Sequence, residues 1–404
     1  MTASTIPDQP DLARMRRDRH ARLQKGMSDH GVDAMILIGN ANVCYAGGAS
    51  WPYGDSGRAN IERPVAVVVS GDEHPHLYTP FREDAAAQLD LPEDHLHGPV
   101  YLDFDEGVEA FGRLLTELVP HKATVAVDDV TGAMARNRDR LFSSWPPPGV
   151  EPIIGHARLL KTPDELACTR KASKITAAAM AEVQKALVPG VRQTQLTARF
   201  LRHIFDLGAE ANILDPIWQV MPDRREDLPW TTHGDVPCPL LTTERQLAAG
   251  DVLWVDTAVS YAGYHSDFGR TWIVGQDPSP RQEAQYQKWK AINDAVLAEV
   301  RPGVNAARLT AAARNLCDGE SPWMPHFYLS HGIGVETAEM PFIGTDLGEE
   351  FDESIVLAPG MIIIIEPIIW DEGAGGYRSE NIYSVTEDGW ILVSDDYPYD
   401  PYGN

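Results

Sequence analysis

A glutamate lies inside a run of isoleucines near the C-terminal end of the chain, in the segment MIIIIEPIIWDEGAGGYRSENIYSV (361–385). Glu366 follows four isoleucines and precedes Pro-Ile-Ile, a pattern typical of a buried strand. A buried carboxylate without a partner costs several kcal/mol or takes up a proton. The fold must therefore bring a basic side chain or a metal ion to Glu366.

A second glutamate follows across the glycine-rich loop DEGAGG (371–376). Glu366 and Glu380 are equally far along the chain from Gly373, so a hairpin centred on that glycine makes them cross-strand neighbours. Two carboxylates at that spacing repel each other unless a cation lies between them. The hairpin therefore predicts a pair of acids at one site.

The same design occurs in residues 251–274, where Asp256 and Asp267 flank a Tyr-Ala-Gly step between two segments rich in β-branched and aromatic residues. A loop at Tyr261-Ala262 makes the two aspartates direct cross-strand partners, whereas a loop at Ala262-Gly263 makes them diagonal neighbours. The sequence leaves these two registers open.

Arginines offer an alternative to a metal ion at both pairs of acids. Arg270 lies three residues after Asp267, and Arg378 lies two residues before Glu380. A salt bridge explains one pair, but two such pairs together with His331 of the motif HGIG favour a metal centre. Four carboxylates and one imidazole suit two divalent ions of Mn, Fe, Co or Zn.

Composition excludes several other functions. With 404 residues, of which 43% are hydrophobic, the chain is long enough for two globular domains. A net charge of −25 repels nucleic acid and anionic membranes and favours small or cationic partners. The four cysteines form no CxxC motif, so no disulfide framework is expected and the protein is predicted to be cytoplasmic. The N-terminal residues contain no apolar export or anchor segment, and no membrane span is predicted.

The chain changes character near residue 155. Residues 1–155 alternate helical and strand segments and predict an α/β domain, and the stretch SSWPPPGVEPIIG (143–155) is dense in proline and glycine, as is typical of a boundary. Residues 156–404 predict an α+β domain with an antiparallel sheet. Helices in this second domain are expected at 163–187, 193–207, 280–300 and 305–318.

The ordered set of two aspartates, one histidine and two glutamates resembles the metallopeptidase family M24, whose pita-bread fold is shared by methionine aminopeptidase, aminopeptidase P, prolidase and creatinase. The resemblance extends to LLKTPDELACTRKAS (159–173), VRPGVNAARL (300–309), LAPGMIIIIEP (357–367) and, for the creatinase-type N-terminal domain, HGVDAMILIGNANVCYAGG (30–48). It implies an α/β creatinase-like domain over 1–155 and a pita-bread catalytic domain with a curved, mainly antiparallel sheet over 156–404.

The resemblance also assigns roles to the candidate site residues. It implies that Asp256 binds one ion, that Asp267 and Glu380 bridge two ions, and that His331 and Glu366 complete the coordination of the second. Glu366 is the expected proton shuttle as well.

Four further residues are expected to contact the substrate or line its pocket. His233 occupies the place of the family histidine that contacts the substrate and the tetrahedral intermediate. Arg378 could bind a substrate carboxylate or pair with a nearby acid, and His326 could line the pocket. Glu336 is a candidate replacement base, for which the alternative is an exposed loop acid.

Two departures from the family pattern leave the substrate open. Ala338 stands where the peptidase members carry a second histidine, and Ile368 follows Glu-Pro where a glycine is usual. The sequence therefore predicts a metal-dependent hydrolase that cleaves a C–N bond in an Xaa-Pro dipeptide or a related small amide. The alternative is a lyase or non-peptide hydrolase acting on a small osmolyte, similar to the dimethylsulfoniopropionate lyases and ectoine hydrolases of the same scaffold.

Two further classes of prediction concern activity and assembly. A non-catalytic binding module is disfavoured because all five family ligands are present. Creatinase-type relatives pair through their N-terminal domains, so a homodimer is expected, and WPYGDSGRANIERP (51–64) is the segment best suited to that contact.

Overall fold

The structure, a computed structural model, describes residues 6–49, 63–120, 122–222, 242–371, 373 and 375–394. Contacts within the chain define two compact units, Gln9–Asp164 and Met1–Asp8 with Glu165–Asn404, which we call the N-terminal and C-terminal units. The sequence places the boundary earlier, at residue 155. In the structure η3 (Glu151–Gly155) and α7 (His156–Leu159) pack against α1 (Leu12–His30) and thus belong with the N-terminal unit.

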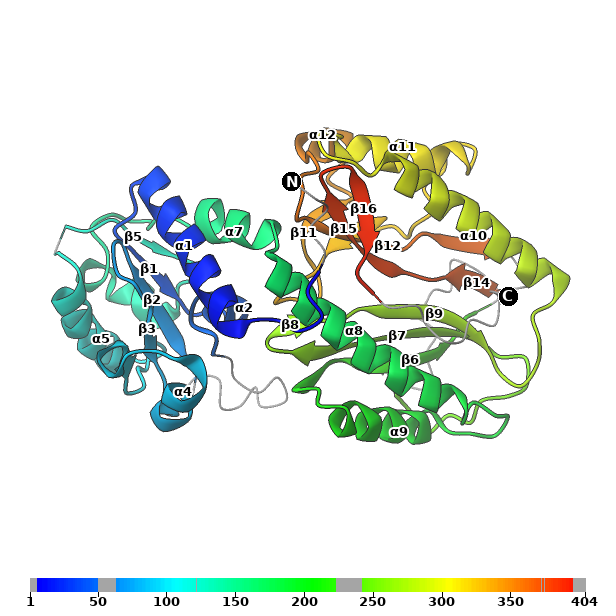
Figure 1. Ribbon diagram of the computed structural model, residues 1–404, viewed down its shortest axis with the longest axis horizontal. Helices are drawn as coiled ribbons and strands as arrows, with labels where there is room; N and C mark the ends of the chain where they lie inside the picture. Colours follow the sequence, from blue (N-terminus) through cyan, green and yellow to red (C-terminus); the bar gives the residue numbers. More distant parts are fainter. Residues whose placement is uncertain are drawn as a thin grey trace. The chain divides into compact units, whose positions relative to one another are not determined.

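The N-terminal unit is built on a five-stranded mixed sheet with the strand order β4-β3-β2-β1-β5 (Figure 1). Strand β1 lies antiparallel to β2 and parallel to β5, and β3 lies antiparallel to β2 and parallel to β4. The strands are β1 (Ala34–Leu37), β2 (Val65–Val69), β3 (His76–Tyr78), β4 (Leu96–His97) and β5 (Val125–Val127). The other helices are α2 (Asn40–Gly47), α4 (Arg82–Leu89), α5 (Asp105–Leu118) and α6 (Gly132–Arg136), with short turns η1 (Glu93–His95) and η2 (Arg138–Arg140).

Strand β1 is buried on both faces, which explains its uninterrupted apolar sequence. Ala34 and Ile36 belong to the hydrophobic core that α5 completes with Phe111 and Leu115. The alternate residues of the strand point to the opposite face because side chains alternate along a strand. The N-terminal unit is therefore the predicted α/β layer structure.

The first sheet of the C-terminal unit is wholly antiparallel and has the order β6-β7-β8, with β9 paired to β7. Helices α8 and α9 cover it, and their apolar faces share one core with the tryptophans Trp218 and Trp272 of the sheet (Figure 1). The elements are α8 (Pro163–Gln184), α9 (Gln193–Asp206), β6 (Ala211–Val220), β7 (Val252–Tyr261), β8 (Tyr264–His265) and β9 (Phe268–Ile273).

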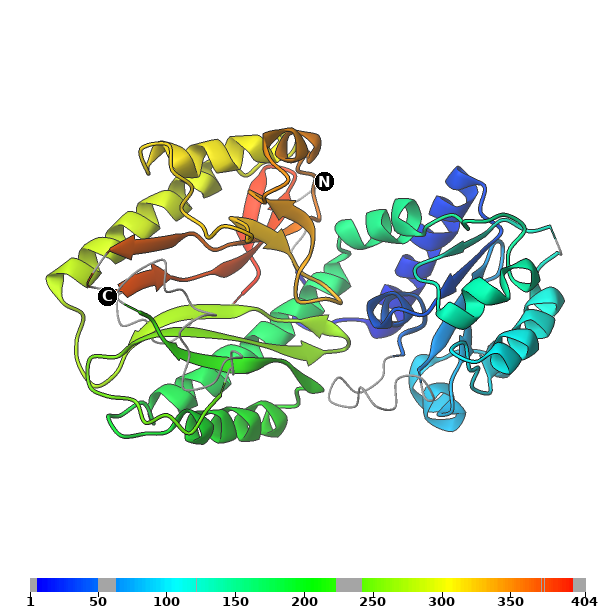
Figure 2. The same cartoon turned by 180° about the vertical axis from the view of Figure 1, so that it is seen from behind.

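The second sheet, order β11-β10-β12-β15-β16, and the ribbon β13-β14 are also antiparallel. Helix α10 packs on the ribbon and α11 packs on β11, as the view from behind shows (Figure 2). The strands are β10 (Ser330–Gly332), β11 (Glu339–Ile343), β12 (Ile362–Ile365), β13 (Ile368–Asp371), β14 (Gly375–Arg378), β15 (Asn381–Thr386) and β16 (Gly389–Leu392). The helices are α10 (Pro280–Glu299), α11 (Ala306–Asn315) and α12 (Glu349–Ser354).

The predicted fold class is confirmed. The four helices expected in the C-terminal domain appear as α8, α9, α10 and α11, each ending within three residues of the expected position. Within the described part of the chain, no helix has the length and apolar character needed to cross a membrane.

Candidate metal centre

The hairpin that carries the two aspartates turns at Ala262 and Gly263. Strands β7 and β9 pair with Asp256 opposite Gly269, and β7 and β8 pair with Tyr261 opposite Tyr264. Both turn residues have positive φ, 51° at Ala262 and 75° at Gly263, as a two-residue type I′ turn requires. The Tyr261-Ala262 loop is therefore the wrong alternative, and the aspartates are diagonal neighbours.

The hairpin that carries the two glutamates has the register centred on Gly373 that the sequence predicts. Ile365 pairs with Asn381 on one side of the acids, and Ile368 pairs with Arg378 on the other. Glu366 and Glu380 thus lie opposite each other in a gap of the strand ladder. Pro367 lacks an N–H, and the backbone N–H groups of the two glutamates donate to Leu329 and Gly269 in other segments.

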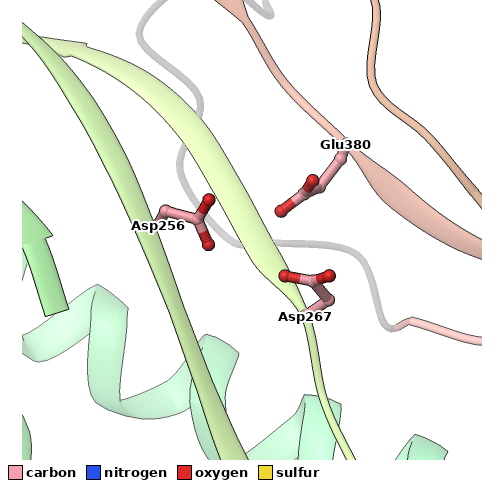
Figure 3. A group of neighbouring side chains, drawn as sticks. All are labelled: Asp256, Asp267 and Glu380. Atoms are coloured by element: carbon pink, nitrogen blue, oxygen red, sulfur yellow. The ribbon is translucent and has the colours of Figure 1, made fainter. Parts of the chain in front are cut away.

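The five predicted ligands come together in the C-terminal unit. One oxygen from each of Asp256, Asp267 and Glu380 lies within 4.8 Å of the others, and the three carboxylates point into a common space (Figure 3). His331 Nε2 lies 3.3 Å from Asp267 Oδ2 and 3.3 Å from Glu366 Oε1. One site is therefore built from four parts of the unit: strand β7, strand β10, the β8–β9 junction and the gap of the glutamate hairpin.

Strand β9 joins the two hairpins. The side chain of Thr271 accepts from the Arg378 N–H at 2.9 Å and donates to the Arg378 carbonyl at 2.7 Å. Arg270 donates to the carbonyl oxygen of Glu380 and, at 3.0 Å, to Asn381 Oδ1. Gly269 lies where a Cβ would overlap Arg378 Nη1 and Glu380 Oε1. A residue without a side chain is required at 269 for the acids to approach each other.

Arg378 lies among the carboxylates rather than at the rim of the site. Its guanidinium is buried and donates to Asp256 Oδ2 at 2.9 Å, to Glu366 Oε2 at 2.6 Å and to Glu380 Oε2 at 2.6 Å. Its face also lies 4.8 Å from the ring centroid of Trp254. The sequence leaves two roles open for Arg378. In the structure it pairs with nearby acids.

The oxygens that Arg378 does not bind meet the requirement of a metal site. Asp256 Oδ1 and Glu380 Oε1 are buried and have no hydrogen-bond partner within the described part of the chain, and the buried Glu366 Oε1 faces His331 Nε2 at 3.3 Å. Each carboxylate thus gives one oxygen to the arginine and directs the other toward its neighbours. Buried lone pairs without donors are costly, and divalent cations with a preference for oxygen satisfy them. These residues fit a divalent metal centre.

The pKa values follow from burial and from these contacts. Burial raises the pKa of Asp256 to about 7, although Arg378 opposes the shift. Burial also holds the pKa of Glu380 well above its usual value. For Glu366 burial acts in the same direction, but Arg378 and His331 outweigh it and lower the pKa of Glu366. Metal binding to such a site must release protons, because the ligand carboxylates bind metal in their charged form.

Burial would lower the pKa of His331, but its hydrogen bonds to Asp267 and Glu366 outweigh burial and raise that pKa to about 10. In the metal-free protein the imidazole therefore carries a proton and a positive charge at neutral pH. Arg378 and protonated His331 together supply only two positive charges for four acids. In the metal-free protein, protons on Asp256 and Glu380 balance the remaining acids, as their raised pKa values indicate, and bound cations can take the place of those protons.

The structure corrects the prediction for His326. Its side chain is 90% exposed, and its Nδ1 lies 2.5 Å from Asp346 Oδ2. The residue has a φ of 61°, and this left-handed backbone turns the imidazole toward solvent. The next residues, Phe327 and Tyr328, turn toward the site.

Of the remaining predicted contacts, the structure describes Glu336 and Ala338. Glu336 is exposed and its carbonyl accepts from the Gly334 N–H, so it is a loop acid and is not brought to the carboxylates. Ala338 is half-buried, immediately before β11. His233 lies outside the described residues.

Tyr328 is a site residue that the sequence reasoning missed. Its ring centroid lies 4.9 Å from that of His331, and burial together with the charges of Glu366 and Asp267 raises the pKa of its hydroxyl. The signal in the sequence was slight, an aromatic pair three residues before the HGIG motif. Gly269 was also missed, although it follows Asp267 by two residues.

Comparison with known proteins identifies the family. The profile of metallopeptidase family M24 matches residues 167–387, and that of the creatinase/prolidase N-terminal domain matches residues 19–158. The chain belongs to metallopeptidase family M24. It is an enzyme of the metal-dependent peptidase type, and the resemblance seen in the sequence is confirmed.

Individual relatives agree over nearly their whole lengths. The Xaa-Pro dipeptidase of Pyrococcus furiosus is 27% identical over 375 residues, which cover 92% of this chain and 96% of the relative. The probable dipeptidase PepE of Mycobacterium tuberculosis is 28% identical, with 91% of each chain covered. Among solved structures, the prolidase from Pyrococcus furiosus matches with a TM-score of 0.70 and 23% identity over 92% of this chain and 99% of its own. The dipeptidase PepE from Mycobacterium ulcerans matches with a TM-score of 0.71 and 25% identity over 97% of this chain and 98% of its own.

Proposed function

We propose that this M24 enzyme is a dipeptidase that binds two divalent metal ions and hydrolyses Xaa-Pro dipeptides or closely related small amides. One observation carries the proposal: two buried carboxylates, Asp256 and Glu380, each leave one oxygen without a hydrogen-bond partner among the described residues, at the place where the predicted ligands converge. The names of the relatives, an Xaa-Pro dipeptidase and a probable dipeptidase, favour a dipeptide over a longer peptide.

Within the proposed site, Asp256, Asp267, Glu380, Glu366 and His331 would hold the ions. Two such ions, of Mn, Fe, Co or Zn, supply an activated water near neutral pH and polarise the scissile carbonyl when bound. Arg378 holds the second oxygen of three of these carboxylates and so fixes the direction of the first. Burial of the acids excludes bulk water and strengthens every charge interaction in the site.

Glu366 is the proposed proton shuttle. Arg378 and His331 hold its pKa below the usual value, so the carboxylate is ionised at neutral pH and can accept a proton from the attacking water. The same carboxyl group can then return the proton to the amine that leaves. The role proposed for His233, contact with the substrate, concerns a residue outside the described part of the chain.

The proposal is tested with protein reconstituted separately with each of the four metals. Gly-Pro, Ala-Pro and Leu-Pro are offered as substrates, with Ala-Ala as the matched dipeptide that lacks proline. We expect release of free proline and the N-terminal amino acid in equal amounts, with about two metal ions per chain by elemental analysis. Failure to cleave any dipeptide at full metal content would contradict the proposal, and an unsaturated acid as product would indicate elimination instead.

A homodimer and a cytoplasmic location stay predictions. Most of the segment proposed for the dimer contact, 51–64, lies outside the described residues; Arg63, at its end, pairs with Asp103 of the same unit at 2.7 Å. Light scattering of the active protein should give twice the monomer mass.

A further inference from the structure

One aromatic side chain stands next to the histidine of the site, and two more pack against it. The ring of Tyr328 lies 4.9 Å from that of His331, with an angle of 52° between the planes. On its other sides the Tyr328 ring stacks on Phe327 at 4.2 Å and meets Phe342 at 5.7 Å. We call Phe327, Tyr328 and Phe342 the aromatic wall.

Within the wall, Tyr328 lies close to the carboxylates. His331 Nε2 is 3.3 Å from both Asp267 and Glu366, so the Tyr328 ring is separated from those acids by a single imidazole. Tyr328 is only half-buried, and no described residue hydrogen-bonds its hydroxyl. Part of the Tyr328 side chain is therefore exposed, although three other rings surround it.

Apolar contacts continue from the wall to the neighbours of Asp256. Phe327 packs against an apolar cluster that contains Ile217 and Trp254. Ile217 pairs with Asp256 across the strands, and Trp254 precedes Asp256 by two residues on the same face of β7. Apolar groups thus lie beside both His331 and Asp256, an arrangement that suits a substrate with one polar group and a bulky apolar group beside it.

We infer that Tyr328 contacts the substrate and that the aromatic wall selects for a bulky apolar group next to the substrate atoms bound at the metal centre. The inference rests on the proposed function for the presence of metal, and it adds the substrate class. Dipeptides with a large apolar side chain, such as Leu-Pro and Phe-Pro, are preferred to Gly-Pro. Burial of such a group against aromatic rings corresponds to a preference of about ten- to a hundredfold.

A purely structural role for Tyr328 makes a different prediction. If the ring only holds His331 in place, its removal weakens metal binding and affects every ligand of the site equally. If the ring contacts the substrate, its removal affects large apolar ligands and leaves small ones nearly unchanged. The size dependence of the loss therefore separates the two roles.

Hydroxamates test this without any requirement for catalysis, because their chelating group binds metal ions directly. Acetohydroxamic acid and cyclohexanecarbohydroxamic acid are titrated calorimetrically into the manganese-loaded full-length protein. We expect wild type to bind the cyclohexane compound at least about tenfold more tightly than the methyl compound, and Tyr328→Ala to reduce this preference to about twofold or less. Tyr328→Phe keeps the ring and should keep the preference, and Tyr101→Ala removes an exposed tyrosine of the N-terminal unit as a matched control.

Each outcome decides the inference. An unchanged preference in Tyr328→Ala overturns it, as does an equal loss for both hydroxamates accompanied by a loss of manganese. Absence of binding by manganese-loaded wild type overturns it too. A wild-type protein that shows the Tyr328-dependent preference but cleaves no dipeptide would support the wall and contradict only the Xaa-Pro activity, so the two proposals fail separately.

Discussion

Both units of the molecule bury a cluster of titratable side chains, but the two clusters have opposite chemistry. The N-terminal unit gathers imidazoles on the edge of its sheet, where His76 lies between His97, at 3.0 Å from Nδ1, and Asp72, at 3.1 Å from Nε2, and stacks on His95 at 4.2 Å. The C-terminal unit gathers four carboxylates around Arg378 and His331. Burial favours the neutral form in both places.

The difference lies in how each cluster satisfies its polar atoms. A neutral imidazole both donates and accepts, so His76 can pass hydrogen bonds along the row without any added charge. An ionised carboxylate only accepts, so the acids need donors or cations from elsewhere. Within the described residues, the one group of three or more ligand atoms with metal-binding spacing is Asp256, Asp267 and Glu380. Ligand-type residues make a metal site only where their free lone pairs converge.

Among the changes that test this contrast between the two clusters, removal of a bridging acid from the C-terminal unit should have the largest effect. Glu380→Ala deletes a proposed ligand of both ions, so we expect the metal content to fall to near zero and kcat/KM to drop about a thousandfold or more, equivalent to about 4 kcal/mol of transition-state stabilisation. Elemental analysis and dipeptide assays measure both. Asp371→Asn, which removes a carboxylate from a surface pair with Arg281, is the matched control and should change neither. Retention of two ions by Glu380→Ala would show that the acids are not held together by metal.

A smaller effect is expected where the two hairpins touch. Gly269→Ala places a methyl group against Arg378 and Glu380, and such overpacking costs about 1–3 kcal/mol. Since it displaces ligands rather than deleting them, we expect metal affinity and kcat/KM to fall about ten- to a hundredfold. Gly98→Ala in the N-terminal unit meets open space and serves as the control. Wild-type metal affinity in Gly269→Ala would mean that the site tolerates a wider separation of its acids.

The convergence of the five proposed ligands could be predicted from the sequence because their positions along the chain encode the hairpins. The register of the glutamate hairpin could be obtained by counting outward from Gly373, since the glycine-rich loop leaves few other centres. The aspartate hairpin was ambiguous because the position of its turn depends on which residues adopt positive φ. Ala262, with a φ of 51°, is an uncommon choice that no local rule favours.

The contacts between elements could not be predicted in the same way. Thr271 and Arg270 bind the segment 378–381 from more than one hundred residues away, and nothing in either sequence segment specifies that pairing. His326 and Tyr328 differ by two positions, yet His326 faces solvent and Tyr328 packs beside His331. Side-chain direction in a loop depends on the fold around it, and a motif does not contain that information.

The smallest effect, and the most direct test of the contrast, is the response of the metal-free protein to pH. Asp256 has an ordinary pKa of 3.8 and a folded pKa of about 7, so the stability it contributes is complete below pH 3.8 and is lost as the pH rises through 7. His331, with a folded pKa of about 10 against 6.5, acts in the same direction at higher pH. In the N-terminal unit, burial and then His76 and His95 lower the pKa of His97 from 6.5 to about 4, so its contribution is complete above pH 6.5 and is lost as the pH falls toward 4.

Between pH 5 and pH 8, therefore, the metal-free C-terminal unit should lose stability while the N-terminal unit gains it. Hydrogen exchange in graded urea measures the stability of the two units separately. The exchange is read by mass spectrometry on peptides from each unit and corrected for the intrinsic exchange rate. We expect opposite shifts in stability, equivalent to a few degrees in Tm. Asp256→Asn should reduce the slope only in the C-terminal unit, and His97→Gln only in the N-terminal unit. Addition of manganese should abolish the loss at high pH, because the ions take the place of the protons. Parallel slopes in the two units would mean that burial and charge pairing do not separate the clusters as we argue.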